Sequence, residues 1–189
     1  RYRQEFDSSS DEELHPKDLE NALVSLVDYC KKFTSDIQKY EVLHTEIAGL
    51  VLISPTSEMH FKIDAICKEG GNKYLYIDHK TSQRKFYNWG DHWILSTQML
   101  LYYHVLNCLY PKENLGESKV RCSFFYTKNK KTGILSPTVF EEVSINKTLP
   151  QMQQWLVRTN TWYQSLKYDM LLLEEEGNTE DICMLAFPL

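Results

Sequence analysis

Three apolar segments joined by two short turns constrain the fold of this chain most strongly. Residues 42–53, 59–68 and 73–80 are each rich in β-branched and apolar side chains. Residues 55–57 contain a proline, and residues 70–72 read Gly-Gly-Asn, so each connection has the composition of a turn. Because connections this short join antiparallel neighbours, the sequence predicts a three-stranded antiparallel meander.

Helical and further strand patterns surround this meander. Apolar residues recur at helical spacing over about 16–33, 91–109 and 148–177, and two more strand-like runs lie at 120–127 and 138–145. This order predicts an α/β fold of α+β-like character, in which a mixed central sheet contains the meander and is flanked by helices.

The first and last predicted helices carry specific expectations. The first helix has an apolar stripe that is expected to pack on the sheet, formed by Leu19, Leu23, Leu26, Val27 and Cys30. At the start of the last helix, Thr148 and Gln151 have the spacing of a capping box.

Length and composition predict one ordinary globular domain over residues 1–189. Residues 1–13 are polar and are expected to be a loose lead-in, and the start at Arg1 suits either a piece of a longer protein or a processed chain. No apolar run is long enough to cross a bilayer, so no membrane partner is expected. The 5 cysteines are widely spaced, which indicates reduced thiols and an intracellular location.

Charge is unevenly distributed along this acidic chain, whose formal net charge is −5. Acidic residues concentrate near the two ends, whereas basic residues gather after the meander and again further on. The basic residues are Lys80, Arg84 and Lys85 in the first cluster, and Lys128, Lys130 and Lys131 in the second. Each cluster is either a solvated loop or a surface that follows a phosphate backbone.

Two acids interrupt the apolar strands of the meander. Asp64 follows Ile63 in the second segment, and Asp78 follows Ile77 in the third. A carboxylate within an apolar strand costs free energy unless it is paired or metal-bound. Lys80 lies two residues after Asp78 and therefore on the same strand face. Two acids and a lysine at neighbouring strand ends suit metal-assisted hydrolysis of a phosphodiester.

These residues carry a resemblance to a known family. The chain reads Ile-Asp at 63–64, Ile-Asp-His-Lys-Thr-Ser at 77–82 and Gln-x-x-x-Tyr at 98–102. In order and spacing these motifs resemble the RecB-like branch of the PD-(D/E)XK nucleases. The resemblance spans about residues 42–106 and implies a restriction-endonuclease-like core. Phe61 departs from it, since many members have glycine three residues before the first of these aspartates.

The resemblance implies a role for each matching residue. Asp64 and Asp78, with the backbone carbonyl of His79, would bind Mg²⁺ or Mn²⁺, and Lys80 would position the attacking water and offset phosphate charge. Glu46 has two open interpretations: a further acid of the metal site, or a surface residue of an edge strand.

Other expected site residues follow the same motif. Gln98 and Tyr102 share a helix face and would order the lysine or contact nucleic acid. Trp89 is expected to stack on unpaired bases, whereas Trp93 is expected to anchor its helix. Members of the family often have a histidine ligand before the strands, and His15 or His44 could take that place. Some relatives hold an iron–sulfur cluster, but Cys183 alone cannot hold one, so none is expected here.

The resulting functional hypothesis is a divalent-metal-dependent nuclease that hydrolyses DNA. Its expected substrates are single strands or duplex ends, and its expected role is exonucleolytic or end-processing work in replication, recombination or repair. A viral source would place it in the host cytoplasm, and a partner subunit or homo-oligomer is compatible with the pattern. The alternatives are a nuclease-like module that binds nucleic acid without cutting it, and a protein-interaction scaffold.

Overall fold

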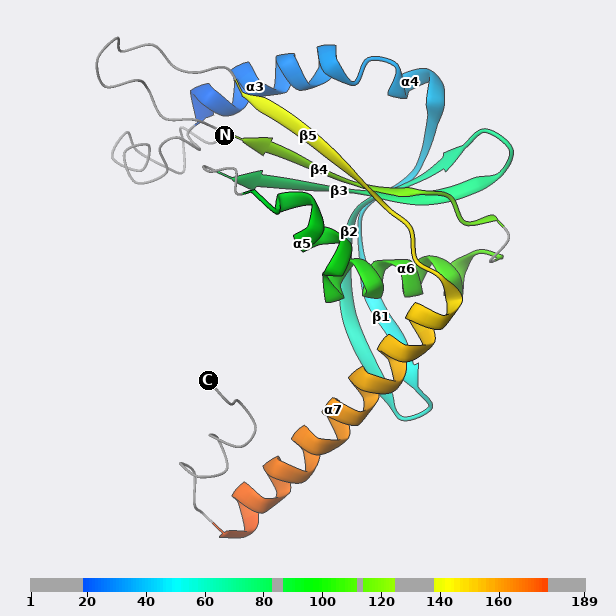
Figure 1. Cartoon of the computed structure of the whole chain (residues 1–189), viewed down its shortest axis with the longest axis vertical. Helices are drawn as coiled ribbons and strands as arrows, with labels where there is room; N and C mark the ends of the chain where they lie inside the picture. The colour runs from blue at the N-terminus through cyan, green and yellow to red at the C-terminus, as the bar shows by residue number, and fades with distance from the viewer. Residues whose placement is uncertain (1–18, 83–86, 112–113, 125–137, 177–189) are drawn as a thin grey trace, which may run out of the picture. The chain divides into compact units, whose positions relative to one another are not determined.

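The computed structural model of the chain describes residues 19–82, 87–111, 114–124 and 138–176 (Figure 1). The chain divides into two compact units. One unit combines the chain up to Ile47 with Lys62–Asn146, and the other combines Ala48–Phe61 with the chain from Lys147 onward. All the site residues expected within the described ranges belong to the first unit.

The described strands form one mixed sheet in the order β1-β2-β3-β4-β5. Their bounds are Tyr40–Ser54 (β1), Ser57–Glu69 (β2), Lys73–Ser82 (β3), Ser118–Phe124 (β4) and Val139–Ile145 (β5). β2 pairs antiparallel with β3, β3 pairs parallel with β4, and β4 pairs antiparallel with β5. The strand order and the mixed sheet confirm the predicted α/β fold.

Helices from the described residues of the first unit accompany the sheet (Figure 1). They are α3 (Leu19–Lys32), α4 (Asp36–Lys39), α5 (Trp89–Leu95) and α6 (Thr97–Leu109). α3 and α4 lie on one face of the sheet and α5 and α6 on the other, so helices flank the sheet as expected.

α6 covers the face of β3 on which the expected catalytic residues lie. The Tyr76 hydroxyl donates to the backbone carbonyl of Met99 (3.3 Å), and the Tyr76 and Tyr102 rings meet edge to face. Because side chains alternate along a strand, Asp78 and Lys80 share this face with Tyr76, whereas His79 faces α3. Buried apolar side chains of β2, β3 and α6 include Ile63, Ile66, Tyr76, Met99 and Leu106.

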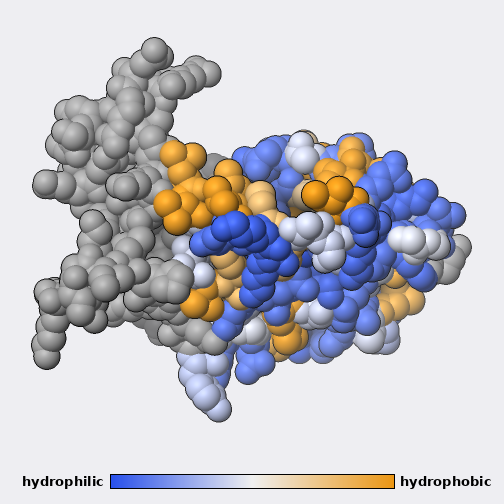
Figure 2. All heavy atoms as spheres, turned by 90° about the horizontal axis from the view of Figure 1, so that it is seen from above, coloured by the Kyte–Doolittle hydropathy of each residue, from blue (hydrophilic) through white to orange (hydrophobic). Residues whose placement is uncertain are grey.

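α3 packs on the opposite face, but not through its predicted apolar stripe. The Tyr29 ring packs edge to face against Phe140, with 5.7 Å between ring centroids, and Ser25 one turn earlier is buried. Leu23, Leu26 and Val27 remain more than half exposed. The expectation that the stripe packs on the sheet is wrong for these residues, since Ser25 and Tyr29 occupy the contacting face. On the face of the molecule shown in Figure 2, hydrophobic residues are exposed between hydrophilic ones.

The segment predicted as one helix over 91–109 contains two helices. Ser96 separates α5 from α6 because its backbone is extended, with φ −64° and ψ 133°. Its side chain accepts a hydrogen bond from the backbone N–H of Gln98 (3.2 Å), which caps α6. The new helix, α6, therefore begins at Thr97, one residue before Gln98.

The second unit contains the hairpin tip over residues 48–61 and α7 (Leu149–Glu176). Thr148 and Gln151 form the predicted capping box: the Thr148 N–H donates to Gln151 Oε1 (2.9 Å), and the Gln151 N–H donates to Thr148 Oγ1 (3.4 Å). Among the described helices, none combines the length and apolar character needed to span a membrane. The described cysteines Cys30, Cys67, Cys108 and Cys122 are free thiols.

Candidate functional site

Asp78 is a buried carboxylate near the carboxyl end of β3. Its side chain is only 2% exposed, and its Oδ2 atom lies 2.9 Å from the Lys80 Nζ atom. The same oxygen makes no hydrogen bond of good geometry to any described residue. Asp78 Oδ2 is therefore held by an ionic contact with Lys80, without a hydrogen bond of good geometry.

The surroundings of Asp78 favour its protonated form in the folded protein. Burial raises the pKa of Asp78 above its ordinary value, the Lys80 ammonium lowers it, and the nearby charge of Asp64 raises it further. Burial is the largest of these causes, so the net direction is upward. A cation beside this carboxylate would stabilise its charged form.

Asp64 lies on the neighbouring strand, where the regular pairing of β2 with β3 ends. The last paired residues are Ala65 and Ile77. Beyond them, the backbone N–H of His79 donates to Asp64 Oδ2 (2.7 Å), so a side chain replaces the strand as its partner. This bond holds the Asp64 carboxylate beside the residue that follows Asp78.

Lys80 is part of a continuous chain of polar contacts on the α6 side of the sheet. Its Nζ atom donates to Gln98 Oε1 (3.1 Å), and Gln98 Nε2 donates to the Tyr102 hydroxyl (2.8 Å). The Tyr102 hydroxyl in turn donates to the backbone carbonyl of Lys62 on β2. The structure thus brings together Asp78, Lys80, Gln98 and Tyr102, as the sequence predicts.

Trp93 completes the surroundings of Lys80. The Lys80 Nζ atom lies 4.9 Å from the centroid of the Trp93 ring, within the range of a cation–π contact. Trp89, in contrast, is 4% exposed and packs against Phe124, with 5.7 Å between ring centroids. The expectation that Trp89 stacks on bases is wrong in this structure, because its ring is buried in the core.

Glu46 does not join the two aspartates. It pairs with Lys62, its side chain is 63% exposed, and its backbone has a positive φ of 51°. Among the described residues, no group of three or more His, Cys, Asp or Glu side chains is placed to hold a metal ion. The interpretation of Glu46 as a surface residue therefore describes this structure better than that of a third ligand.

Several expected residues lie outside the described part of the chain. They are Arg84, Lys85, Lys128, Lys130 and Lys131 of the basic clusters, with His15 and Cys183. His44 is described; it is an exposed residue of β1.

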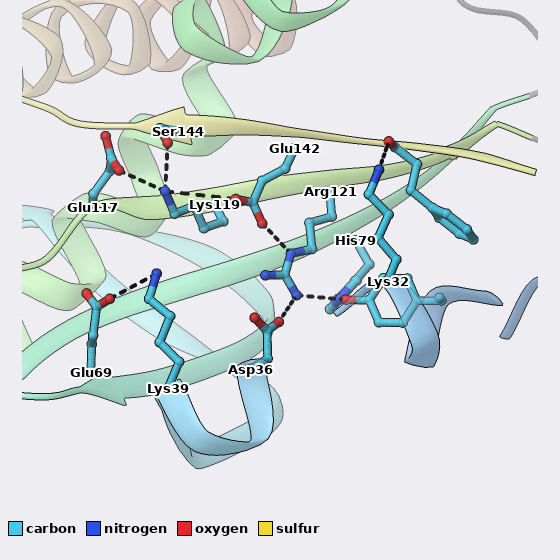
Figure 3. A network of polar contacts seen from close by, with 12 residues as sticks. Lys32, Asp36, Lys39, Glu69, His79, Glu117, Lys119, Arg121, Glu142 and Ser144 are labelled. Carbon is cyan, nitrogen blue, oxygen red and sulfur yellow. Dashed lines mark hydrogen bonds and ion pairs between the residues drawn. The ribbon is translucent and has the colours of Figure 1, made fainter. Parts of the chain in front are cut away.

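The other face of β3 carries a second polar network, which is centred on Arg121 (Figure 3). His79 and Arg121 are paired across β3 and β4. Arg121 is only 5% exposed, and it forms ion pairs with Asp36 (2.5 Å) and Glu142 (2.6 Å). Two carboxylates from different elements thus balance one buried guanidinium.

Tyr29 connects this guanidinium to His79. Arg121 Nη1 donates to the Tyr29 hydroxyl (3.0 Å), and the same hydroxyl lies 2.8 Å from His79 Nε2. On the other side of the ring, His79 Nδ1 is 3.8 Å from Asp64 Oδ2. The Arg121 network therefore reaches Asp64 through the His79 ring.

The local electrostatics of this network keep both rings uncharged near neutral pH. Partial burial lowers the pKa of His79, the Asp64 charge raises it, and the Arg121 charge lowers it. Burial likewise raises the pKa of Tyr29, and the hydrogen bond from Arg121 lowers it. In each case burial is the largest cause, so the neutral form is favoured.

A cavity of about 290 Å³ adjoins this network between α3 and the strands. It is lined by Ala22, Ser25, Leu26, Tyr29, His79, Lys80, Thr81 and Ser123. The side chain of His79 is correspondingly about half exposed, at 45%.

The two aspartates fit a magnesium or manganese ion in their chemistry. Both ions prefer oxygen ligands, and Mg²⁺ is typically held by one or two carboxylates with waters and substrate oxygens. Asp78 has a buried oxygen without a hydrogen bond, and Asp64 is partly exposed, at 30%. Two carboxylates with the His79 carbonyl form a sparse donor set, which leaves coordination positions for a phosphate.

Comparison with known proteins adds a likeness to solved structures. No protein-family model and no curated protein matches the chain. One solved structure, titled "Crystal structure of SSO0001", is similar at 14% sequence identity and a TM-score of 0.39, over 85% of this chain and 68% of that one.

Sequence reasoning missed the residues around His79, although one signal was available. Arg121 interrupts an apolar strand in the same way as Asp64 and Asp78 do. A charge in that position needs a buried partner, so it indicates a polar network on the sheet. Tyr29 gave no such signal, because an aromatic residue in an amphipathic helix usually packs in the core.

Proposed function

We propose that the chain is a divalent-metal-dependent nuclease that hydrolyses phosphodiester bonds of DNA. The observation that carries the proposal is the pairing of buried Asp78 with Lys80, with Asp64 held beside them at His79. Burial of a carboxylate costs free energy even when one ammonium group pairs with it, and such cost is concentrated at functional sites.

Asp64, Asp78 and the backbone carbonyl of His79 would hold Mg²⁺ or Mn²⁺. When bound, such an ion polarises the phosphate and lowers the pKa of a coordinated water. The protein's own contribution is to keep two carboxylates close together, although their mutual repulsion opposes this. The hydrogen bond from the His79 backbone to Asp64 offsets part of that repulsion.

Lys80 would orient the attacking water and balance charge that develops on the phosphate. Asp78, Gln98 and the Trp93 ring each contact its ammonium group, so its position is restricted. Tyr102 restricts Gln98 in turn through its hydroxyl. Because these groups are held before substrate arrives, little reorganisation accompanies the reaction.

We infer that the substrates are single strands or duplex ends in replication, recombination or repair. The basic residues of the two clusters, Arg84, Lys85, Lys128, Lys130 and Lys131, would contact the phosphate backbone. The free thiols suit a reducing, intracellular compartment. A partner subunit or a second copy is compatible with the exposed apolar residues of α3.

Cleavage of end-labelled DNA with Mg²⁺, with Mn²⁺ and with EDTA tests the proposal. We expect metal-dependent cleavage by the wild type, and a loss of at least about 100-fold in Asp78→Asn and in Lys80→Gln. Matched exposed substitutions, Asp91→Asn and Lys31→Gln, are expected to cleave at the wild-type rate. Either site variant cutting as fast as its control would remove the basis of the proposal.

A second candidate function is a nuclease-like module that binds DNA without cutting it. It is favoured by the lack of a three-ligand group among the described residues. In that case DNA binding would be unaffected by EDTA, and no product would form with either metal. A protein that binds Mn²⁺ and cleaves DNA excludes this candidate.

A further inference from the structure

The His79 ring lies between a proposed metal ligand and helix α3. Its Nδ1 atom is 3.8 Å from Asp64 Oδ2, and its Nε2 atom is 2.8 Å from the Tyr29 hydroxyl. The backbone N–H of the same residue donates to the same Asp64 oxygen. His79 therefore contacts Asp64 through both its backbone and its side chain.

Hydrogen-bond chemistry determines where the protons of this network lie. A guanidinium can only donate, so the Tyr29 oxygen accepts from Arg121. Among the described residues, the Tyr29 hydroxyl has no acceptor other than His79 Nε2. The hydroxyl proton therefore points to Nε2, and in the neutral ring the remaining proton is on Nδ1, facing Asp64.

Arg121 fixes the Tyr29 end of this network. Asp36 on α4 and Glu142 on β5 hold the guanidinium from two directions (Figure 3). Its central carbon also lies 4.0 Å from the centroid of the Phe33 ring. With so many contacts, the donor to Tyr29 has little freedom to move.

We propose that Tyr29, oriented by Arg121, positions the His79 ring so that its Nδ1–H faces Asp64, and that this relay increases the affinity of Asp64 for a divalent cation. The inference rests on the proposed function, because it concerns the same metal site. It assigns Tyr29 as a positioning residue, which acts through His79 and contacts neither metal nor substrate.

The physical reason is that Asp64 must keep one orientation to share a cation with Asp78. A ring N–H that faces its oxygen restricts the carboxylate and offsets its charge repulsion with Asp78. Groups that orient metal ligands in this way typically contribute 10- to 100-fold in metal affinity. Because Tyr29 on α3 sets the orientation of the His79 ring, the position of α3 affects the affinity of the site for metal.

Tyr29→Phe removes the hydroxyl and keeps the aromatic packing against Phe33 and Phe140. Calorimetric titration with Mn²⁺ is expected to show about 10-fold weaker binding in this variant. The matched control is Tyr103→Phe on α6, which removes a hydroxyl that donates to the Asn146 side chain. This variant is expected to bind Mn²⁺ with the affinity of the wild type. Equal affinity in Tyr29→Phe and wild type would overturn the proposal.

A double-mutant cycle with His79→Gln tests whether Tyr29 acts through His79. If it does, Tyr29→Phe weakens Mn²⁺ binding in the wild-type background and causes no further loss in the His79→Gln background. Independent, additive losses would show that Tyr29 has a general structural effect instead, and would contradict the relay.

The protonation pattern can be read without metal or activity. In metal-free protein with neutral His79, ¹⁵N NMR of the ring is expected to show a protonated Nδ1 and an unprotonated Nε2. In Tyr29→Phe, the ¹⁵N chemical shift of Nε2 is expected to move to that of a nitrogen that accepts no hydrogen bond. The opposite tautomer would overturn the relay, whatever the metal affinity. A wild-type protein with this tautomer that binds no Mn²⁺ would instead overturn the proposed function and the claim about cation affinity.

Discussion

At the scale of single residues, the site is governed by one unfavourable placement. Asp78 is buried, and the attraction of Lys80 does not fully offset the cost of burial, since the pKa of Asp78 is raised. Such a residue lowers the free energy of unfolding at neutral pH unless a metal ion binds it. The stability of the metal-free protein is therefore a direct measure of this cost.

Asp78→Asn tests this cost. A raised pKa means that the folded protein binds the Asp78 proton more tightly than the unfolded chain does. Asp78 thus favours folding most below its ordinary pKa, and that contribution is lost as the pH rises through the raised value. In EDTA, we expect Asp78→Asn to have a higher Tm than wild type at about pH 7, with the difference closing towards about pH 4.

The exposed residue Asp91 provides the control for this experiment. Asp91→Asn should leave the Tm of the metal-free protein unchanged at both pH values. A Tm of Asp78→Asn below that of wild type at neutral pH would show that the ion pair with Lys80 outweighs burial, contrary to the account.

Residue burial is also where prediction from sequence was least successful. Trp89 and Trp93 are four residues apart on one short helix, and the expectation for Trp89 was wrong: Trp89 is in the core, whereas Trp93 is partly buried beside Lys80. Both rings suit either environment, so the outcome depends on which side of α5 meets the sheet. It was easier to predict the strand faces of Asp64, Asp78 and Lys80, because side chains alternate between the two faces of a strand.

At the scale of elements, α6 connects the site to the sheet core. Tyr102 on this helix bonds both Gln98 and the carbonyl of Lys62 on β2. The four-residue spacing predicted that Gln98 and Tyr102 share a helix face, whereas the contact of Tyr102 with Lys62 depends on how α6 packs on the sheet. Similarly, nothing in the apolar pattern around Ser96 marks a helix break, because the residue that stops α5 is neither proline nor glycine.

Tyr102→Phe separates positioning from metal binding. The lost hydroxyl leaves a partly buried carbonyl without its partner, so we expect the free energy of unfolding in urea to fall by about 1–3 kcal/mol. Because Lys80 then loses an ordered Gln98, the cleavage rate should fall while Mn²⁺ affinity is retained. A variant that loses Mn²⁺ affinity as Asp64→Asn does would place Tyr102 among the metal-binding residues instead.

Ser96→Ala tests the cap of α6. Without the side-chain acceptor for the Gln98 N–H, we expect the free energy of unfolding to fall by about 1 kcal/mol. Ser165 on α7 is the matched control, since its hydroxyl bonds a carbonyl within the helix and does not cap it. If Ser96→Ala unfolds at the same urea concentration as Ser165→Ala, the cap does not stabilise α6.

At the scale of the whole molecule, the site depends on only one of the two units. Asp64, Asp78, Lys80, Gln98 and Tyr102 all belong to the unit that contains β3, β4 and β5. The order of strands and helices in that unit was predictable from periodicity and turn composition. The Arg121 network was not, because it joins α3, α4, β3, β4 and β5, and no local pattern reports such distant contacts.

Binding of metal to the folded protein should stabilise the molecule as a whole. An ion that binds only the folded state raises its stability by mass action, by about 2.7 kcal/mol at a concentration 100-fold above Kd. We therefore expect Mn²⁺ to raise the Tm of the wild type in a concentration-dependent way, and to have no such effect on Asp64→Asn. Equal shifts in both proteins would place the binding elsewhere.

The central claim is that Asp64 and Asp78 share one divalent cation. Anomalous diffraction from crystals soaked in Mn²⁺ tests this claim most directly. We expect a manganese peak in contact with a carboxylate oxygen of each aspartate and with the His79 carbonyl. Crystals saturated with Mn²⁺ that show no peak between the two carboxylates would contradict it.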